Sequence, residues 1–199
     1  MKKQINLNNH ITFLNRKTTL PSKLFQESTI TEETIQGILE AALTTPPCYG
    51  AQQNTHLVLC DEVDLLVRLS EVFGSDSHIV SLTSDAAFCL VVLHSPQFSP
   101  HWREEAAVVA THARLQAISL GLTAHWVHIS ERESYDGGDA GEYVKRILGI
   151  PYQMEVVCLL FIGKTQQSQP MTSYTLKGGL SMEQEDLPWE LLHINEFSL

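Results

Sequence analysis

Short apolar runs of strand length recur along the chain and alternate with segments whose apolar residues repeat at helical spacing. Uninterrupted apolar runs predict strands over residues 55–60, 87–94 and 154–162, each buried on both faces. Residues 123–129 also have an extended pattern. Because predicted strands and helices alternate, we expect one layered domain over residues 1–199, of the α/β or α+β class.

Four helices are predicted, one before the first strand and three between the strands. The first begins at Thr31, a good N-cap before two glutamates, and ends at the Pro46-Pro47 pair, which cannot continue the hydrogen-bond ladder. The second covers residues 61–73, with Leu66, Leu69 and Phe73 on one stripe, and a short helix covers 143–148 before a stop at 149–151. The pair Gly137-Gly138 marks a polar turn between the extended segment 123–129 and the short helix.

The longest predicted helix covers residues 102–120 and is closed by Gly121. The residues of its predicted inner stripe are mostly alanines: Ala106, Val109, Ala110, Ala113, Ala117 and Leu120. Small side chains let another helix approach closely, so this helix is expected to be central and is a candidate subunit contact. The adjacent acids Glu104-Glu105 are expected on its solvated face.

Composition excludes several classes of protein. Lys and Arg number 13 against 23 Asp and Glu, and the net charge of −10 argues against a general nucleic-acid binder. No apolar run approaches the roughly 18–20 residues of a membrane span, so no membrane association is expected. The basic start of the chain lacks the apolar stretch of a signal peptide, which favours a cytoplasmic protein.

Cysteine and histidine spacing predicts neither disulfides nor a metal site. Cys60, Cys89 and Cys158 each lie inside an apolar strand-like run and are expected to be buried free thiols. Among the nine histidines, His125 and His128 are three apart in an extended segment and therefore point to opposite faces. No glycine-rich nucleotide loop or GxSxG elbow is present.

Three segments, in order, carry a family resemblance. They are 13–19 (Phe-Leu-Asn-Arg-Lys-Thr-Thr), 41–52 (Ala-Ala-Leu-Thr-Thr-Pro-Pro-Cys-Tyr-Gly-Ala-Gln), and the alanine-rich helix into 121–127 (Gly-Leu-Thr-Ala-His-Trp-Val) followed by 148–151 (Leu-Gly-Ile-Pro) and the strand at 156–163. Together with the ending at 187–195, they resemble the nitroreductase family of FMN-dependent oxidoreductases over roughly residues 12–195.

The resemblance implies a fold, an assembly and a reaction. The fold is a central, mainly antiparallel sheet flanked by helices, in a homodimer whose C-terminal extension, residues 164–199, packs on the partner. The polar, irregular composition of that extension also indicates that it must lie over other structure. In the implied reaction, NAD(P)H passes hydride to FMN, which reduces a small acceptor such as a nitroaromatic or quinone.

The resemblance also implies cofactor-binding residues but no catalytic side chain. Segment 13–19 and the late Lys177 would hold the phosphate, the loop after the first helix would contact the flavin ring, and the backbone near Trp126 would face the reactive nitrogen. The full set is Arg16, Lys17, Thr18, Pro47, Cys48, Gly50, Gln52, Trp126, Val127, His128 and Lys177. Each assignment has a structural alternative. Arg16 and Lys17 would be a solvated basic pair and Gln52 an ordinary polar loop residue, while Trp126 would belong to the core and His128 would face outward.

Several positions depart from the family pattern. Gly50 stands where many members carry Asn, Leu20 where they often carry a basic residue, and Lys164-Thr165 where they carry Tyr-Pro. The resemblance therefore implies fewer contacts to FMN than usual. Two other functions stay open: a nitroreductase-fold flavin- or ligand-binding protein without turnover, acting as a sensor or storage module, and a purely structural partner-binding domain.

Overall fold

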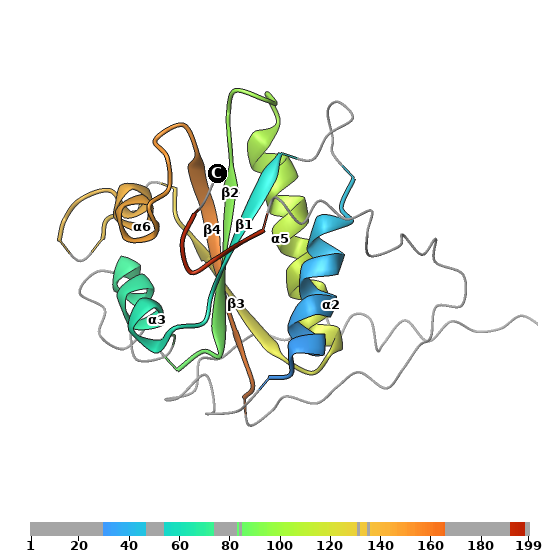
Figure 1. Cartoon of the computed structure of the whole chain (residues 1–199). Coiled ribbons are helices and arrows are strands. Elements are labelled where there is room, and N and C mark those ends of the chain that lie inside the picture. Colours follow the sequence, from blue (N-terminus) through green and yellow to red (C-terminus); the bar gives the residue numbers. More distant parts are fainter. Residues whose placement is uncertain are drawn as a thin grey trace, which may run out of the picture.

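The computed structural model describes residues 30–46, 54–73, 83, 85–130, 132–134, 136–165 and 192–197. The elements in chain order are α2 (Glu32–Leu43), β1 (Thr55–Cys60), α3 (Val63–Ser70), the 3₁₀ turn η1 (Glu71–Phe73), β2 (Phe88–His94), α5 (Trp102–Ser119), β3 (Thr123–His128), α6 (Ala140–Leu148), β4 (Glu155–Gly163) and β5 (Leu192–Ile194) (Figure 1). Each strand predicted from an apolar run is present within one residue of its expected bounds.

The described strands form one mixed sheet in the order β3-β4-β2-β1-β5. Neighbouring strands are antiparallel, except that β5 lies parallel to β1. All seven residues of the central strand β2 are buried, because strands and helices cover it on every side. The expectation of a central, mainly antiparallel sheet flanked by helices is therefore confirmed.

Helices cover both faces of the sheet. Figure 1 shows α2 and α5 on one face and α3 and α6 on the other. Each face has its own apolar core: Phe88 and Leu90 belong to the core under α2 and α5, whereas Phe161 and Leu159 belong to the core under α3 and α6. Side chains of one strand alternate between these two cores, which explains why the strands are apolar at consecutive positions.

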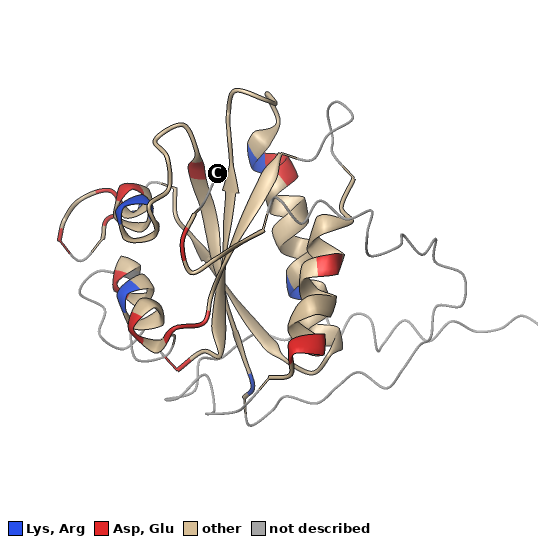
Figure 2. Ribbon diagram, viewed as in Figure 1, with Lys and Arg blue, Asp and Glu red and all other residues tan. Residues whose placement is uncertain are grey.

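Each of the four described helices has an acidic residue in its first turn, where a negative charge interacts favourably with the helix dipole. These acids give the helices much of the negative charge visible in Figure 2. The Thr31 side chain also caps α2 by accepting a hydrogen bond from the backbone N–H of Thr34. The predicted first helix is thus confirmed, and it ends at Leu43, ahead of Pro46.

The alanine stripe of α5 is central, as expected. Ala106, Ala110, Ala113 and Ala117 are fully buried, and α5 packs against α2 and the sheet of its own chain. The stripe is therefore covered within the chain and cannot itself be a subunit contact, whereas a contact through the exposed side of the helix stays a prediction. Leu120 does not extend the stripe either: α5 ends before it, Gly121 turns the chain at a φ of 81°, and Leu120 remains 40% exposed.

Two other helices differ from their predicted bounds. The segment 61–73 is divided, because the α-helix ends at Ser70 and the chain tightens into η1. Helix α6 begins three residues before the predicted Tyr143, where Asp139 accepts a hydrogen bond from the Glu142 N–H. The stop after this helix is confirmed, since Gly149 adopts the left-handed conformation with a φ of 67°.

Strand β5 was not predicted. Its three residues pair with Leu57, Val58 and Leu59 of β1, and the backbone N–H of Phe197 then donates to the carbonyl of Leu148. Apart from residues 164–165 and 192–197, the C-terminal extension lies outside the described residues. Its expected packing on a partner therefore stays a prediction. No helix within the described residues is long and apolar enough to cross a bilayer.

Candidate functional site

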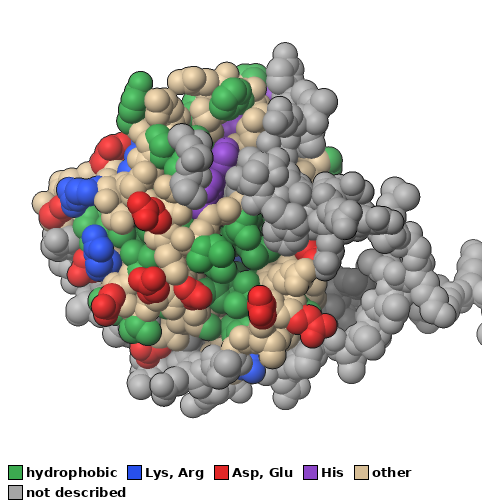
Figure 3. Space-filling view, in the orientation of Figure 1, with side chains coloured by type: hydrophobic (Ala, Val, Ile, Leu, Met, Phe, Trp, Pro, Cys, Tyr) green, Lys and Arg blue, Asp and Glu red, His purple; other side chains and the backbone are tan. Residues whose placement is uncertain are grey.

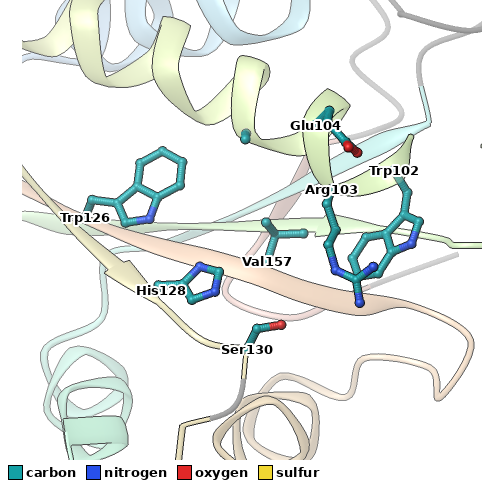
Figure 4. Close-up of a pocket in the computed structure, with 8 residues that line it drawn as sticks. Trp102, Arg103, Glu104, Trp126, His128, Ser130 and Val157 are labelled. Atoms are coloured by element: carbon teal, nitrogen blue, oxygen red, sulfur yellow. The ribbon is translucent and has the colours of Figure 1, made fainter. Parts of the chain in front are cut away.

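A pocket of about 300 Å³ lies beside strand β3, between this strand, β4 and the first turns of α5 (Figure 4). The residues that line it come from three elements: Trp102, Arg103, Glu104 and Ala107 from α5, Trp126, His128 and Ser130 from β3 and the residues after it, and Val157 from β4. Two indoles and two aliphatic side chains thus meet a small number of polar groups. This composition is typical of a small-molecule site.

The two-residue period of β3 decides which of its side chains reach the pocket. Trp126 and His128 line it, whereas the side chain of Val127 is 2% exposed in the core under α3 and α6. His125 shares the side of Val127, so the two histidines do point to opposite faces. In the described part of the chain β3 is an edge strand. Every second backbone N–H therefore points away from the sheet and is available to a ligand.

His125 is electrostatically different from a surface histidine. Its burial, together with the nearby guanidinium groups of Arg114 and Arg132, lowers its pKa below the usual value of 6.5. This imidazole is therefore neutral at pH 7. It lies across the sheet from the pocket, so we assign it no role there.

The opposite end of the pocket is formed by the first turn of α5. The guanidinium carbon of Arg103 lies 4.0 Å from the centre of the Trp102 ring, which is a stacked cation–π arrangement. Figure 4 shows this pair at one end of the pocket and Trp126 at the other, with Val157 and His128 between them. The Glu104 carboxylate lies well apart from the guanidinium in the same view.

A buried polar network holds this turn of α5 in place. Glu105 is 3% exposed; its Oε2 lies 2.9 Å from Nε2 of His94, and its Oε1 accepts a hydrogen bond of 3.0 Å from the Ser99 hydroxyl. The Ser99 oxygen in turn accepts from the backbone N–H of His101. Glu105 thus connects the end of β2, the loop that follows it and the start of the helix.

The hydrogen-bond partners determine where the protons lie in this network. Nδ1 of His94 is 3.0 Å from the carbonyl oxygen of Ser95, which can only accept, so Nδ1 carries a proton. One proton therefore lies between Nε2 of His94 and the carboxyl group of Glu105, whichever of the two carries it. The expectation that Glu105 is solvated is wrong. It falls four and eight residues before Val109 and Ala113, which places it on the inner face of α5.

The cysteines behave as predicted. Cys60, Cys89 and Cys158 are free and buried in the sheet. Burial raises the pKa of the Cys60 thiol to about 12, with smaller contributions from the carboxylates of Asp61 and Glu62, and burial also raises the pKa of Cys89 and Cys158. These thiols are not nucleophiles at neutral pH. Within the described ranges, no group of three or more His, Cys, Asp or Glu side chains could hold a metal ion.

The structure brings only part of the predicted site together. Of the predicted residues that it describes, Trp126 and His128 line the pocket, whereas Val127 is buried in the core and does not line it. The others lie outside the described residues: Arg16, Lys17, Thr18, Pro47, Cys48, Gly50, Gln52 and Lys177. The sequence analysis did not assign Trp102 and Arg103 to the site, although both line the pocket. The signal that could have indicated them is an aromatic residue next to a cationic one at the start of the long central helix.

Comparison with known proteins identifies the fold. No protein-family model matches the chain. A curated relative from Archaeoglobus fulgidus, named "Putative NADH dehydrogenase/NAD(P)H nitroreductase", is 23% identical over 145 residues, which cover 71% of this chain and 78% of the relative.

Solved structures agree with this relative. An FMN-dependent nitroreductase from Clostridium difficile R20291 superposes with a TM-score of 0.68 at 23% identity, covering 94% of this chain and 99% of its own. A nitroreductase with bound FMN from Desulfitobacterium hafniense DCB-2 has a TM-score of 0.54 at 19% identity, with 80% and 91% covered. The chain therefore has the nitroreductase fold. The resemblance to the nitroreductase family indicated by the ordered sequence motifs is confirmed.

Proposed function

We propose that this chain is a flavin-dependent oxidoreductase, in which FMN takes hydride from NAD(P)H and passes it to a small acceptor such as a nitroaromatic or a quinone. The observation that carries the proposal is a pocket with two indole walls at the edge of a nitroreductase-fold sheet. The names of the relatives, which include a nitroreductase with bound FMN, support the same function. The proposed protein is a cytoplasmic homodimer that acts on small molecules.

The described residues fit the flavin ring chemically. An isoalloxazine has large apolar faces and a polar pyrimidine edge, so it needs flat apolar walls and a few hydrogen-bond donors. Trp126 and Val157 provide such walls, and the Ser130 hydroxyl and His128 imidazole provide polar groups. The outward N–H groups of edge strand β3 add donors whose position is set by the sheet.

When bound, FMN would supply the hydride-transfer chemistry, which the amino-acid side chains do not provide. The chain's own residues would orient the ring, exclude water from it with the two indoles, and stabilise charge at its edge. The imidazole of His128 lines the pocket, and we propose that it gives a proton to the reduced acceptor. We propose no other proton donor.

For the phosphate we propose Arg16, Lys17, Thr18 and Lys177, and for the ring edge the loop with Pro47, Cys48, Gly50 and Gln52. These proposals rest on the motif resemblance. Arg can meet a phosphate through two parallel N–H groups, whereas Lys presents a point charge. Arg16→Ala should therefore weaken FMN binding roughly ten- to hundredfold, and more than Lys17→Ala does.

One titration tests both the binding of FMN and its reduction by NADH or NADPH. The purified protein is titrated with FMN, its absorption spectrum is recorded, and the wild type is compared with Arg16→Ala and the matched variant Lys17→Ala. We expect a saturable flavin spectrum that bleaches when NADH or NADPH is added without oxygen. Flavin binding without bleaching by either donor would support the alternative of a sensor or storage protein. A protein that binds no FMN would overturn the proposal.

A further inference from the structure

We propose that Arg103 makes this pocket selective for planar aromatic acceptors that carry a carboxylate. The inference rests on the proposed function, because it names the class of molecule that the flavin would reduce. It is carried by the geometry of the α5 end of the pocket, where the guanidinium of Arg103 lies over the Trp102 ring and both residues line the pocket.

Stacking leaves the hydrogen-bonding edge of Arg103 open. The guanidinium carbon of Arg103 lies over the Trp102 ring, 4.0 Å from its centre, and the N–H donors of an arginine lie in the plane of its guanidinium. Within the described residues, the Arg103 side chain has no ion pair or hydrogen bond besides this stacking. A fork of parallel N–H donors matches the two oxygens of a carboxylate.

The rest of the pocket suits an aromatic ring attached to that carboxylate. With a flavin ring against Trp126 and Val157, the ring of the acceptor would lie on the α5 side of the pocket, where Trp102 and Ala107 offer apolar surface next to Arg103. The molecule as a whole carries a net charge of −10 and repels anions. An anionic acceptor therefore needs a local cation, and among the described residues Arg103 forms no ion pair with the neighbouring Glu104.

The cation is also held in place before a ligand arrives. Glu105 anchors the first turn of α5 through His94 and Ser99, and the contact with the Trp102 indole restricts the positions of the exposed guanidinium. Little side-chain entropy is then lost when a carboxylate binds. A phosphate offers similar anionic chemistry, so the test must separate an acceptor carboxylate from the phosphate of FMN.

The experiment measures binding without turnover. FMN-loaded protein in its oxidised state, with no NAD(P)H present, is titrated calorimetrically with 4-nitrobenzoate and with its neutral counterpart 4-nitrobenzyl alcohol. We expect wild-type protein to prefer the benzoate and Arg103→Gln to lose about tenfold in affinity for it, with less than a twofold change for the alcohol. Arg103→Lys should recover part of the loss, because it restores the charge but not the fork.

Arg68→Gln is the matched control. It removes the same charge from an exposed position on α3, which covers the opposite face of the sheet, so both ligands should bind as in wild type. Thermal unfolding followed by circular dichroism verifies that each variant is folded. An Arg103→Gln variant that keeps the benzoate preference, or that loses both ligands equally, would overturn the inference.

A second experiment tests whether Arg103 binds the carboxylate of the acceptor or the phosphate of FMN. FMN and riboflavin, which lacks the phosphate, are titrated into flavin-free wild type and Arg103→Gln. If Arg103 binds the acceptor, the ratio of the two flavin affinities is unchanged, whereas a collapse of that ratio would assign Arg103 to the phosphate and overturn the inference. If the wild type binds no flavin, the proposed function fails. The same pair of nitro compounds, titrated into the flavin-free protein, then still decides whether Arg103 selects a carboxylate.

Discussion

At the residue scale, the buried polar atoms at the junction of β1, β2 and α5 differ in how well they are satisfied. His94 and Glu105 bond to each other and to neighbours, although both are almost fully buried. Thr55, which pairs with His94 across the β1–β2 ladder, is also fully buried, but its hydroxyl has no hydrogen-bond partner among the described residues. A desolvated, unbonded hydroxyl costs about 1–3 kcal/mol.

Thr55→Val should therefore stabilise the protein. Valine has nearly the shape of threonine and keeps its β-strand preference, so the substitution removes the unbonded hydroxyl without opening a cavity. We expect the free energy of unfolding, measured by urea denaturation, to rise by about 1 kcal/mol. Thr111→Val is the control, because that hydroxyl is exposed and bonds to the Ala107 carbonyl. A decrease in stability for Thr55→Val would mean that its hydroxyl has a role that the structure does not show.

At the scale of one element, the start of α5 illustrates how a helix end can be positioned from inside the fold. Its N-terminal residue His101 makes no side-chain cap. The first turn is instead attached to the end of β2 by the Glu105–His94 pair and to the preceding loop by Ser99. Because Trp102, Arg103 and Glu104 belong to this same turn, the network also sets the shape of the pocket.

Substitution of Glu105 should separate hydrogen bonding from charge. Gln can donate to Nε2 of a His94 protonated at Nδ1 and can accept from Ser99, so Glu105→Gln should change the free energy of unfolding by less than about 1 kcal/mol. Glu105→Leu leaves Nε2 of His94 and the hydroxyl proton of Ser99 without a partner, and we expect a loss of about 2–4 kcal/mol by urea denaturation together with weaker FMN binding.

Tyr143→Phe is the control for the loss of stability alone. It removes the hydrogen bonds from the Tyr143 hydroxyl to the Arg68 carbonyl and to Glu71, on the face of the sheet away from the pocket. This variant should be less stable but should bind FMN as wild type does. Equal FMN affinity in Glu105→Leu and wild type would show that the network stabilises the fold without positioning the pocket.

At the scale of the whole molecule, the described chain leaves surfaces that a partner could cover. Ile194 on strand β5, an edge strand of the described sheet, is 63% exposed. The face in Figure 3 shows a patch of apolar side chains among acidic ones. The alanine stripe of α5 is already used inside the chain. A homodimer must therefore form through other surfaces, and its interface stays a prediction.

The predicted homodimer can be tested in solution. Obligate interfaces bury roughly 2,000 Å² or more, so dissociation should accompany unfolding, and the midpoint of thermal unfolding should rise with protein concentration. Sedimentation velocity at micromolar concentration should give a single species of about twice the 22.3 kDa chain mass. A folded monomer at this concentration, with a melting temperature independent of concentration, would contradict the dimer.

The elements themselves could be predicted from the sequence wherever the signal is local. Strands β1, β2 and β4 are apolar at consecutive positions because helices cover both faces of the sheet, and α2 carries its own cap. Burial of the three cysteines follows from the same runs. The order of the motifs indicated the fold, although each motif alone is weak. These features depend on a few neighbouring residues, so the chain's own pattern was sufficient.

Strand β5, the buried Glu105–His94 pair and the pocket were decided by the tertiary structure alone. Strand β5 has three residues, too few for a pattern, and exists because β1 offers it an edge. The pairing of Glu105 with His94 crosses from a helix to a strand, and nothing in the sequence near either residue specifies the other. Trp102 and Trp126 face one pocket because α5 packs back over the sheet. Local propensity specifies elements, whereas a site depends on contacts between residues far apart in the chain, and only the packed fold creates those contacts.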